Sequence, residues 1–343
     1  MTRSIKIILS AFAALVFQAS AFAQPVEREV RLDSTGGVSL TGALSLPAGP
    51  GPHPALLLLS GSGPQDRDSW SPEIGEHRPF ADWATHLSAR GYVVLRLDDR
   101  GVGGSGGAYQ HATGADLAAD AASALAWLRN GSGLAIDEAG YLGHSEGGSI
   151  AMLANQSERA DFIVMLAGPA VDFREVFSGQ YRAQQRASGD SAANIDANQD
   201  FLSAIYATLD AHADAPQPAA RAALGETFDR LGIPHEAGAD VLAADQMRFW
   251  VGHDMRAPIR TAGAPVLGLY AEHDISVDPL QNAASLSGMI DPAEGSLVRV
   301  LPGVNHMFQA ADGPLTDIAS APHAVSPAVM DYVAAWLDGQ TSQ

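Results

Sequence analysis

AGYLGHSEGGSIAML, residues 139–153, sets an apolar run directly before a G-x-S-x-G pattern centred on Ser145. The run is typical of a strand, and the residues after Ser145 are typical of a helix. A sharp strand-to-helix turn can hold a serine hydroxyl away from the backbone, and the glycines at 143 and 147 allow it without Cβ clashes. The pattern therefore predicts a nucleophilic serine at a strand end, with an ordinary serine in a glycine-rich turn as the alternative.

Apolar runs of strand length recur on both sides of Ser145, and helical patterns separate them. Such runs are typical of strands buried on both faces, and their alternation with helices indicates an α/β fold with a mostly parallel, doubly wound sheet. Residues 27–33 and 38–47 are predicted to form an opening hairpin through Gly36 and Gly37. The other predicted strands lie within residues 54–60, 91–99, 139–145, 161–168, 263–274 and 296–303, and the clearest helices lie within 116–129, 145–155 and the segment after Pro327.

The alternation stops between about residues 172 and 262. This interval is rich in Ala, Asp, Gln and Arg, and its aromatic residues are spaced as in amphipathic helices. We expect a helical cap, residues 172–262, inserted into an α/β core that comprises residues 24–171 and 263–343. Phe249 and Trp250 carry the largest apolar surface of the insertion, so Trp250 is a candidate wall of a substrate site. Packing within the insertion's own core is the alternative.

Residues 1–23 have the features of a secretory signal peptide. Arg3 and Lys6 precede the apolar run Ile7–Phe17, and Ala21-Phe22-Ala23 offers small residues at the cleavage positions. We expect an exported protein, periplasmic or secreted, with a retained N-terminal anchor as the alternative. The apolar run is too short to span a bilayer comfortably, so no stable membrane insertion is expected after cleavage.

The composition excludes several kinds of chemistry. The chain has 343 residues and a formal net charge of −19, which makes nucleic acid an unfavourable partner. It has no cysteine, and Lys6 is its only lysine. A thiol nucleophile is therefore excluded, and so are a Ser–Lys dyad and a Schiff base once the signal peptide is removed. A nucleophilic serine must rely on histidine.

GVGGSG, residues 101–106, matches the G-x-G-x-x-G dinucleotide pattern and follows a predicted strand. A dinucleotide site needs a helix that begins within the glycines, so that its N-terminus faces the pyrophosphate. Here the glycines continue to Gly114 before any helical pattern begins. We therefore expect no cofactor, and we interpret the segment as a structural loop with a buried ion pair among Asp98, Asp99 and Arg100.

Two later strand ends carry the partners that a nucleophilic serine needs. Asp274 follows one predicted strand, and His306 follows the next. Because these strand ends should meet Ser145 at one edge of the sheet, His306 can act as the base and Asp274 can orient it. The chain order of nucleophile, acid and base is that of α/β-hydrolases. Asp278 is the alternative acid.

The other histidines are weaker candidates for the base. His144 is expected to point off the other side of the turn, and His273 is expected to be a loop residue. His253 lies in the insertion, and His323 stands before the final helix. No spacing among the eleven histidines suggests a metal site.

Two backbone N–H groups near Ser145 are needed to hold the oxyanion of a tetrahedral intermediate. One is predicted to come from Glu146, the first residue of the helix. The other is predicted to come from Ser62, in the loop SGSGP that follows the strand within residues 54–60. Gly61 is the alternative donor and lets the backbone approach the substrate. A plain turn is the competing interpretation of this loop.

Five motifs, LLLLSGSGPQDRD, RLDDRGVGGSGG, LGHSEGG, AEHDISVDP and PGVNHMF, follow one another between about Val26 and Trp336. In this order they resemble bacterial α/β-hydrolase esterases close to the serine aminopeptidase-like and dienelactone hydrolase-related groups. The resemblance implies an α/β-hydrolase fold and a serine hydrolase active on short acyl esters, with triad and oxyanion loop placed as above. Glu146 after the nucleophile also appears in that esterase group, whereas the insertion matches no motif and leaves substrate choice open.

We therefore expect a carboxylesterase that cleaves short-chain, small-molecule acyl esters through an acyl-enzyme, without a metal or an organic cofactor. An aminopeptidase or acyl-peptide hydrolase with the same triad is the first alternative. It would need carboxylates such as Asp172 and Glu175 to hold a substrate ammonium group. The second alternative is a non-catalytic exported binding protein, which the filled triad positions disfavour.

Overall fold

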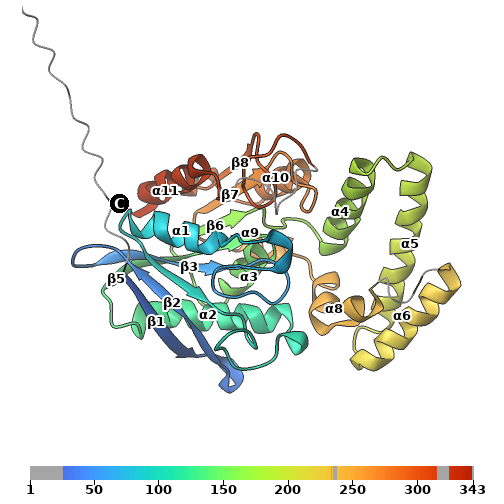
Figure 1. The fold of residues 1–343 in the computed structure, drawn as a ribbon, viewed down its shortest axis with the longest axis horizontal. Helices are drawn as coiled ribbons and strands as arrows, with labels where there is room; N and C mark the ends of the chain where they lie inside the picture. Colours follow the sequence, from blue (N-terminus) through green and yellow to red (C-terminus); the bar gives the residue numbers. More distant parts are fainter. Residues whose placement is uncertain (1–25, 233, 235–237, 315–323, 342–343) are drawn as a thin grey trace, which may run out of the picture.

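The computed structural model describes residues 26–341 except 233, 235–237 and 315–323, so the predicted signal peptide and His323 lie outside the described residues. Within these described residues, eight strands form one sheet in the order β1-β2-β4-β3-β5-β6-β7-β8 (Figure 1). The strands β1, β2 and β4 pair antiparallel, and the other pairs are parallel, which confirms the predicted sheet class. The bounds are β1 Val26–Asp33, β2 Ser39–Leu46, β3 His53–Leu59, β4 Val93–Leu97, β5 Ile136–His144, β6 Ile163–Leu166, β7 Val266–Ala271 and β8 Leu297–Leu301.

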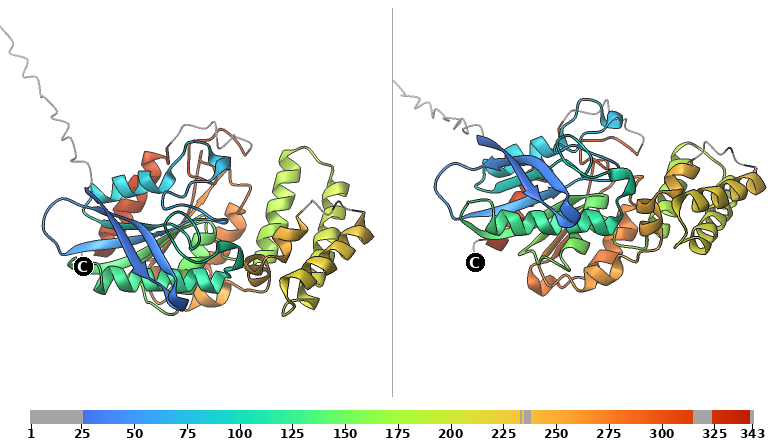
Figure 2. Two further views of the ribbon diagram at one scale, coloured as in Figure 1. Left: turned by 60° about the horizontal axis from the view of Figure 1, so that its bottom comes forward. Right: turned by 90° about the horizontal axis from the view of Figure 1, so that it is seen from below.

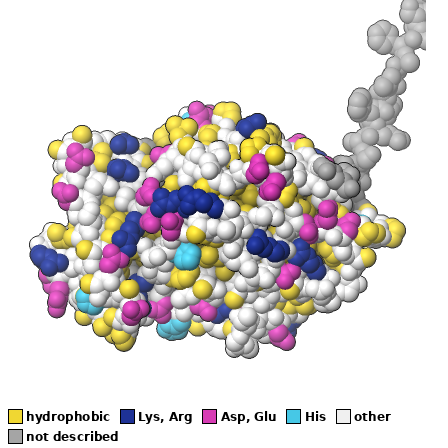
Figure 3. All heavy atoms as spheres, turned by 180° about the vertical axis from the view of Figure 1, so that it is seen from behind, with side chains coloured by type: hydrophobic (Ala, Val, Ile, Leu, Met, Phe, Trp, Pro, Cys, Tyr) yellow, Lys and Arg dark blue, Asp and Glu magenta, His cyan; other side chains and the backbone are white. Residues whose placement is uncertain are grey.

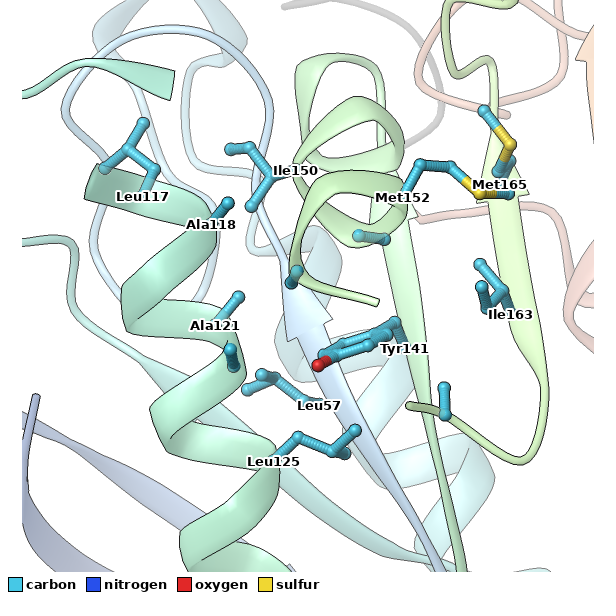
Figure 4. Packing of buried hydrophobic residues seen from close by; sticks show 14 of the residues in the cluster. Leu57, Leu117, Ala118, Ala121, Leu125, Tyr141, Ile150, Met152, Ile163 and Met165 are labelled. Atoms are coloured by element: carbon cyan, nitrogen blue, oxygen red, sulfur yellow. The ribbon is translucent and has the colours of Figure 1, made fainter. Parts of the chain in front are cut away.

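Helices cover both faces of the sheet. On one face α2 and α3 pack against side chains such as Leu57 and Tyr141, and Figure 4 shows this layer. On the other face α1 and α11 pack against Leu56, Leu58 and their neighbours. Because successive strand residues point to opposite faces, continuous apolar runs supply both cores. The core helices are α1 Pro79–Ser88, α2 Gly114–Asn130, α3 Glu146–Ala154, α10 Pro279–Ser287 and α11 Pro327–Thr341, with 3-10 turns η1 Thr35–Gly37, η2 Pro72–Ile74, η3 Tyr109–His111 and η5 Pro292–Glu294.

The chain between β6 and β7 is helical, and most of it lies beyond one end of the sheet (Figures 1 and 2). We call α4–α8 the cap. It has an apolar cluster of its own around Leu209, Leu224 and Phe228. The last helix of the interval contacts α3 and so belongs with the core. The bounds are α4 Phe173–Ala187, α5 Ala192–Ala211, α6 Gln217–Leu231, α7 Ala239–Ala243, α8 Asp245–Val251 and α9 Arg256–Arg260.

The glycine-rich segment 101–106 lies in a loop, and α2 begins only at Gly114. The predicted ion pair within residues 98–100 is wrong. Asp98 pairs instead with Arg67 at 2.9 Å, and Arg100 pairs with Asp120 at 2.7 Å. Asp98 and Arg100 each find a partner in another part of the chain, which sequence adjacency does not reveal.

The molecular surface mixes both signs of charge. On the face drawn in Figure 3, Arg side chains lie in small groups beside Asp and Glu. Among the described residues, no helix combines the length and the apolarity that crossing a bilayer requires.

Candidate active site

Ser145 occupies the sharp turn between β5 and α3, with φ 55° and ψ −123°. A positive φ is uncommon for a residue with a side chain. The flanking glycines are required by close contacts. A Cβ on Gly143 would lie 2.2 Å from the carbonyl oxygen of Gly147, and a Cβ on Gly147 would lie 2.1 Å from the carbonyl oxygen of Leu59. The G-x-S-x-G spacing therefore follows from how tightly the turn packs on β3.

His306 and Asp274 form a close pair on the loops after β8 and β7. His306 Nδ1 lies 2.7 Å from Asp274 Oδ2. The Asp274 side chain is fully buried, and its Oδ1 accepts hydrogen bonds from the backbone N–H groups of Ser276 and Val277 at 2.7 and 2.9 Å. These bonds fix the carboxylate against the imidazole. Asp278 instead caps α10, where it accepts from the N–H groups of Leu280 and Gln281.

Ser145 and His306 line the same cavity, which has a volume of about 240 Å³. No hydrogen bond joins Ser145 Oγ to His306 Nε2 within the described residues. Catalytic hydrogen bonds are often long or poorly aligned before a substrate binds. The cavity walls come from the segment between β3 and α1, from the loops after β5, β6, β7 and β8, and from α4: Gly61, Ser62, Gln65, Ser69, Ser71, Ile74, His144, Glu146, Pro169, Phe173, Val176, Phe177, Gln180, Ser276, Val277 and Met307.

His144 does not point away from the site, so that expectation is wrong. Its Nε2 lies 2.9 Å from the backbone carbonyl oxygen of His306, and the two imidazole rings are 4.8 Å apart. Burial, reinforced by the neighbouring His306, lowers the pKa of His144 to about 4, so the ring is neutral at pH 7. A carbonyl oxygen only accepts, so Nε2 carries the proton. The positive φ of Ser145 reverses the chain and places the His144 ring against His306.

The oxyanion loop, residues 60–65, passes directly over Ser145. A Cβ on Gly61 would lie 3.3 Å from Ser145 Cβ, which makes glycine the residue that fits best. Within the described part of the chain, the backbone N–H groups of Ser62 and Glu146 donate to no protein acceptor, and both residues line the cavity. Both N–H groups are therefore available on the cavity that contains Ser145, and their role as oxyanion donors stays a prediction.

Asp99 and Gln65 hold this loop, and the sequence did not point to either role. Asp99 accepts hydrogen bonds from the Gln65 backbone N–H at 2.9 Å and from Ser60 Oγ at 3.4 Å. Gln65 Nε2 donates to the Ser62 carbonyl oxygen at 3.0 Å. Burial raises the pKa of Asp99 to about 8. Its position directly after β4, a neighbour of β3, was the signal available in the sequence.

Trp250 does not line the cavity, which corrects its assignment as a substrate-binding residue. Trp250 is 1% exposed and its indole stacks on Phe173 with ring centroids 4.6 Å apart, so Phe173 lies between it and the cavity. The amphipathic pattern of α8 did not indicate which of two adjacent aromatic residues faces the core. In the structure α4, through Phe173, Val176 and Phe177, supplies the apolar wall.

The remaining sequence candidates lie away from the cavity lining. Asp172 caps α4, and Glu175 is bound by Arg256 and Gln281. His253 stacks on Phe249 in the cap with centroids 4.8 Å apart. The backbone N–H of His273, in the loop after β7, donates to the carbonyl oxygen of Val304. In the part of the chain that the structure describes, no group of three or more His, Cys, Asp or Glu residues is arranged to hold a metal ion.

Comparison with known proteins identifies the family and the fold. The profile of the X-Pro dipeptidyl-peptidase (S15 family) matches residues 36–289, most of the chain. Esterase EstD of Thermotoga maritima is 31% identical over 301 residues, which are 87% of this chain and 65% of that protein. This chain therefore spans a little under two thirds of that relative's length.

Solved structures of low sequence identity share the fold. An esterase of Pyrococcus furiosus aligns with a TM-score of 0.57 at 14% identity, over 93% of this chain and 92% of its own. The α/β hydrolase GrgF of Penicillium sp. sh18 aligns with a TM-score of 0.56 at 17% identity, over 93% of this chain and 100% of its own. Est1E of Butyrivibrio proteoclasticus, solved with ferulic acid, aligns with a TM-score of 0.55 at 15% identity, over 92% of this chain and 100% of its own. This chain belongs to the X-Pro dipeptidyl-peptidase (S15) family and is an α/β-hydrolase related to bacterial esterases.

Proposed function

We propose that this protein is an exported serine carboxylesterase that cleaves short-chain acyl esters through an acyl-enzyme. The main support for the proposal is that His306 Nδ1 lies 2.7 Å from Asp274 Oδ2, while His306 lines the same cavity as Ser145. A base oriented by a buried carboxylate beside a turn-exposed serine is the arrangement that activates a hydroxyl as a nucleophile.

The proposed mechanism assigns one role to each group. His306 accepts the Ser145 proton at Nε2, since Nδ1 is engaged by Asp274. The serine oxygen attacks the ester carbonyl, and the N–H groups of Ser62 and Glu146 hold the resulting oxyanion. His306 then protonates the leaving alcohol, and a water molecule, activated by the same base, hydrolyses the acyl-enzyme. Asp274 maintains the imidazole tautomer and stabilises its cation.

The size and lining of the cavity support a short acyl group. Its volume of about 240 Å³ is below the roughly 300–1,000 Å³ that is typical of pockets for drug-sized ligands. Phe173, Val176 and Phe177 supply apolar surface close to Ser145, which favours an alkyl group over a charged one.

The family match gives a specific reason to retain a second candidate, cleavage of peptides after an X-Pro dipeptide. Such a substrate presents an ammonium group that needs a carboxylate near the nucleophile. Asp172 and Glu175 are occupied in capping and ion pairing and do not line the cavity. Glu146 does line it, but its side chain is buried and its carboxyl accepts a hydrogen bond from Gln246. This observation favours ester substrates.

Reaction with a fluorophosphonate probe tests the proposal most directly. We expect the wild-type protein to be labelled and to hydrolyse nitrophenyl butyrate, and we expect Ser145→Ala to do neither while retaining its fold. Faster turnover of alanyl-prolyl nitroanilide than of the ester would favour the peptidase candidate. Absence of labelling in folded wild-type protein would favour a non-catalytic binding protein.

The proposal of export has a separate test. We expect the mature protein recovered from the periplasm or the medium to begin at Gln24, because cleavage is predicted after Ala23. An intact N-terminus on cell-associated protein would indicate a retained anchor.

A further inference from the structure

We propose that Gln246, on the cap helix α8, is a positioning residue that aligns both predicted oxyanion donors through Glu146 and Tyr109. The inference rests on the proposed function, because it assigns a role in the same acyl transfer. Gln246 does not line the catalytic cavity, so it acts through other residues and not by contact with the substrate.

The amide of Gln246 joins two residues from distant parts of the core. Its Nε2 donates to Glu146 Oε1 at 2.7 Å and to the Tyr109 hydroxyl at 2.8 Å. A side-chain amide nitrogen has two N–H groups, so one nitrogen can make both bonds. Glu146 begins α3, and Tyr109 lies in η3. The cap thus supplies the bridge between the nucleophile helix and the loop after β4.

Glu146 and Tyr109 in turn contact the oxyanion loop. An interaction with the Ser62 hydroxyl counteracts the raised pKa of the Glu146 carboxyl, and an interaction with the backbone N–H of Gly63 counteracts the raised pKa of the Tyr109 hydroxyl. Ser62 and Glu146 also line the same cavity. The two groups that Gln246 holds therefore lie beside two consecutive residues of this loop. Glu146 also supplies the second predicted donor through its own backbone N–H. We therefore expect the position of this amide to affect both predicted donors.

The surroundings of the Glu146 carboxyl explain why it needs this donor. The Glu146 side chain is buried, and burial raises the pKa of its carboxyl, while interactions with Ser62 and Gln246 counteract the shift. A buried acceptor that loses its donor is unfavourable, so its side chain tends to turn toward another partner. Rotation of the Glu146 side chain would disturb its contact with Ser62 and thus the donor loop.

Docking of the cap helix does not depend on Gln246. Trp250 stacks on Phe173 at 4.6 Å, and Phe249 and Trp250 pack so closely on α2 that a Cβ on Gly114 would lie 2.5 and 2.6 Å from their rings. These apolar contacts hold α8 in place when the amide is changed. A substitution at Gln246 therefore separates alignment of the donors from attachment of the cap.

Gln246→Met tests the proposal, because it keeps the side-chain length and removes both hydrogen bonds. Gln184→Met is the matched control, since Gln184 is an exposed cap glutamine outside the catalytic cavity. The measurements are kcat and KM for nitrophenyl butyrate, and the Ki of an alkyl trifluoromethyl ketone, whose serine adduct carries an oxyanion.

We expect Gln246→Met to lower kcat about 10- to 100-fold with KM changed less than about threefold, and to weaken ketone binding by the same factor as kcat/KM. Outright removal of an oxyanion donor lowers kcat roughly 10²- to 10³-fold, and a displaced donor should lower it less. Gln184→Met should match wild type. A merely structural role would lower Tm and leave kcat and the ketone Ki of the folded fraction unchanged, and that result would overturn the proposal.

A double-variant cycle gives a second, independent readout. Tyr109→Phe removes one arm of the bridge, and its losses should be non-additive with those of Gln246→Met because both act on one network. Additive losses would contradict the shared network. If Gln246→Met does not fold, the same comparison of kcat and Ki is made with Tyr109→Phe alone. A wild-type protein inactive on esters would instead refute the proposed function, so the two failures are distinguishable.

Discussion

His144 donates a hydrogen bond from its imidazole Nε2 to the backbone carbonyl of His306, across 2.9 Å. The residue before the nucleophile thus holds the backbone of the residue proposed as the base. Asp274 fixes the imidazole of His306 from the side chain, and His144 fixes its main chain. The proposed base is therefore restrained from two sides.

His144→Phe keeps a ring of similar size and removes the hydrogen bond to His306. We expect kcat/KM for nitrophenyl butyrate to fall about tenfold, because one net hydrogen bond contributes roughly 0.5–1.5 kcal/mol. His273→Gln is the control, since His273 lies in the loop after β7 and does not line the cavity. Equal activity of wild type and His144→Phe would assign His144 to packing alone.

The lowered pKa of His144, about 4, makes the protein's stability depend on pH. The unfolded chain protonates this histidine near pH 6.5, so between about pH 6.5 and 4 the unfolded state binds more protons than the folded state. The stability associated with a neutral His144 is therefore lost as the pH falls through that window. In urea unfolding, the wild-type protein should lose up to about 3 kcal/mol of its free energy of unfolding between pH 7 and pH 4, and His144→Phe should not show this loss.

The raised pKa of Asp99 predicts the opposite dependence, a stability that falls as the pH rises. Burial raises its pKa to about 8, so between about pH 4 and 8 the folded state binds the proton that the unfolded state has released. Stability from this group is present below about pH 4 and is lost as the pH rises toward 8. The stability of Asp99→Asn relative to wild type should therefore be greater at pH 8 than at pH 5, as measured by denaturant midpoints. A pH-independent difference would contradict the raised pKa.

The two aspartates after β7 should differ sharply in their effect on catalysis. Asp274→Asn should lower kcat by roughly 10⁴-fold, the scale seen when a triad loses control of its imidazole tautomer. Asp278→Asn should change kcat little, because asparagine caps helices about as well as aspartate and Asp278 caps α10. The reverse ranking of the two variants would assign the role to Asp278.

Acyl-chain selectivity should depend on Phe177, which lines both the catalytic cavity and a second, largely apolar cavity of about 630 Å³ in the cap. For wild type we expect kcat/KM to rise from acetate to butyrate, roughly fourfold per methylene, and then to fall. Phe177→Ala should move the optimum toward octanoate by joining the two cavities.

Trp250→Ala is the control for that series. Because Trp250 stacks behind Phe173, the substitution Trp250→Ala should reduce stability by about 3–5 kcal/mol and leave the shape of the chain-length profile unchanged. The profiles are measured on acetate, butyrate, octanoate and laurate esters. A profile of Phe177→Ala parallel to wild type would show that Phe177 does not limit the acyl chain.

The sheet was predictable from the sequence because each buried strand is an apolar run with a turn signal at its end. Leu56 and Leu57 face opposite helical layers, so a central strand has to be apolar throughout. The proposed triad was predictable for a related reason, since Ser145, Asp274 and His306 each follow a parallel strand. The structure places Asp274 on His306, and the catalytic roles stay predictions until the variants are measured.

Other features depend on which way a side chain turns, and no local pattern records that. His144 lies against His306 because of the backbone reversal at Ser145, and Trp250 faces the core although its neighbour is also aromatic. The bond between Gln246 and Glu146 joins residues a hundred positions apart. The bond of Gln246 arises only when the cap is placed on the core, and the contact of His144 arises only when the loop after β8 meets the turn at Ser145.

The position of the cap between two neighbouring strands also bears on how the chain folds. Leu166 of β6 pairs with Leu269 of β7, so these strands meet only across the whole intervening segment. During synthesis, β6 is made while its partner strand is still about a hundred residues away, and its open edge is a site for aggregation. Early collapse of the cap around Leu224 and Phe228 would bring its ends together and shorten the loop that must close. The cap would then act as a folding aid for the sheet before it serves any substrate.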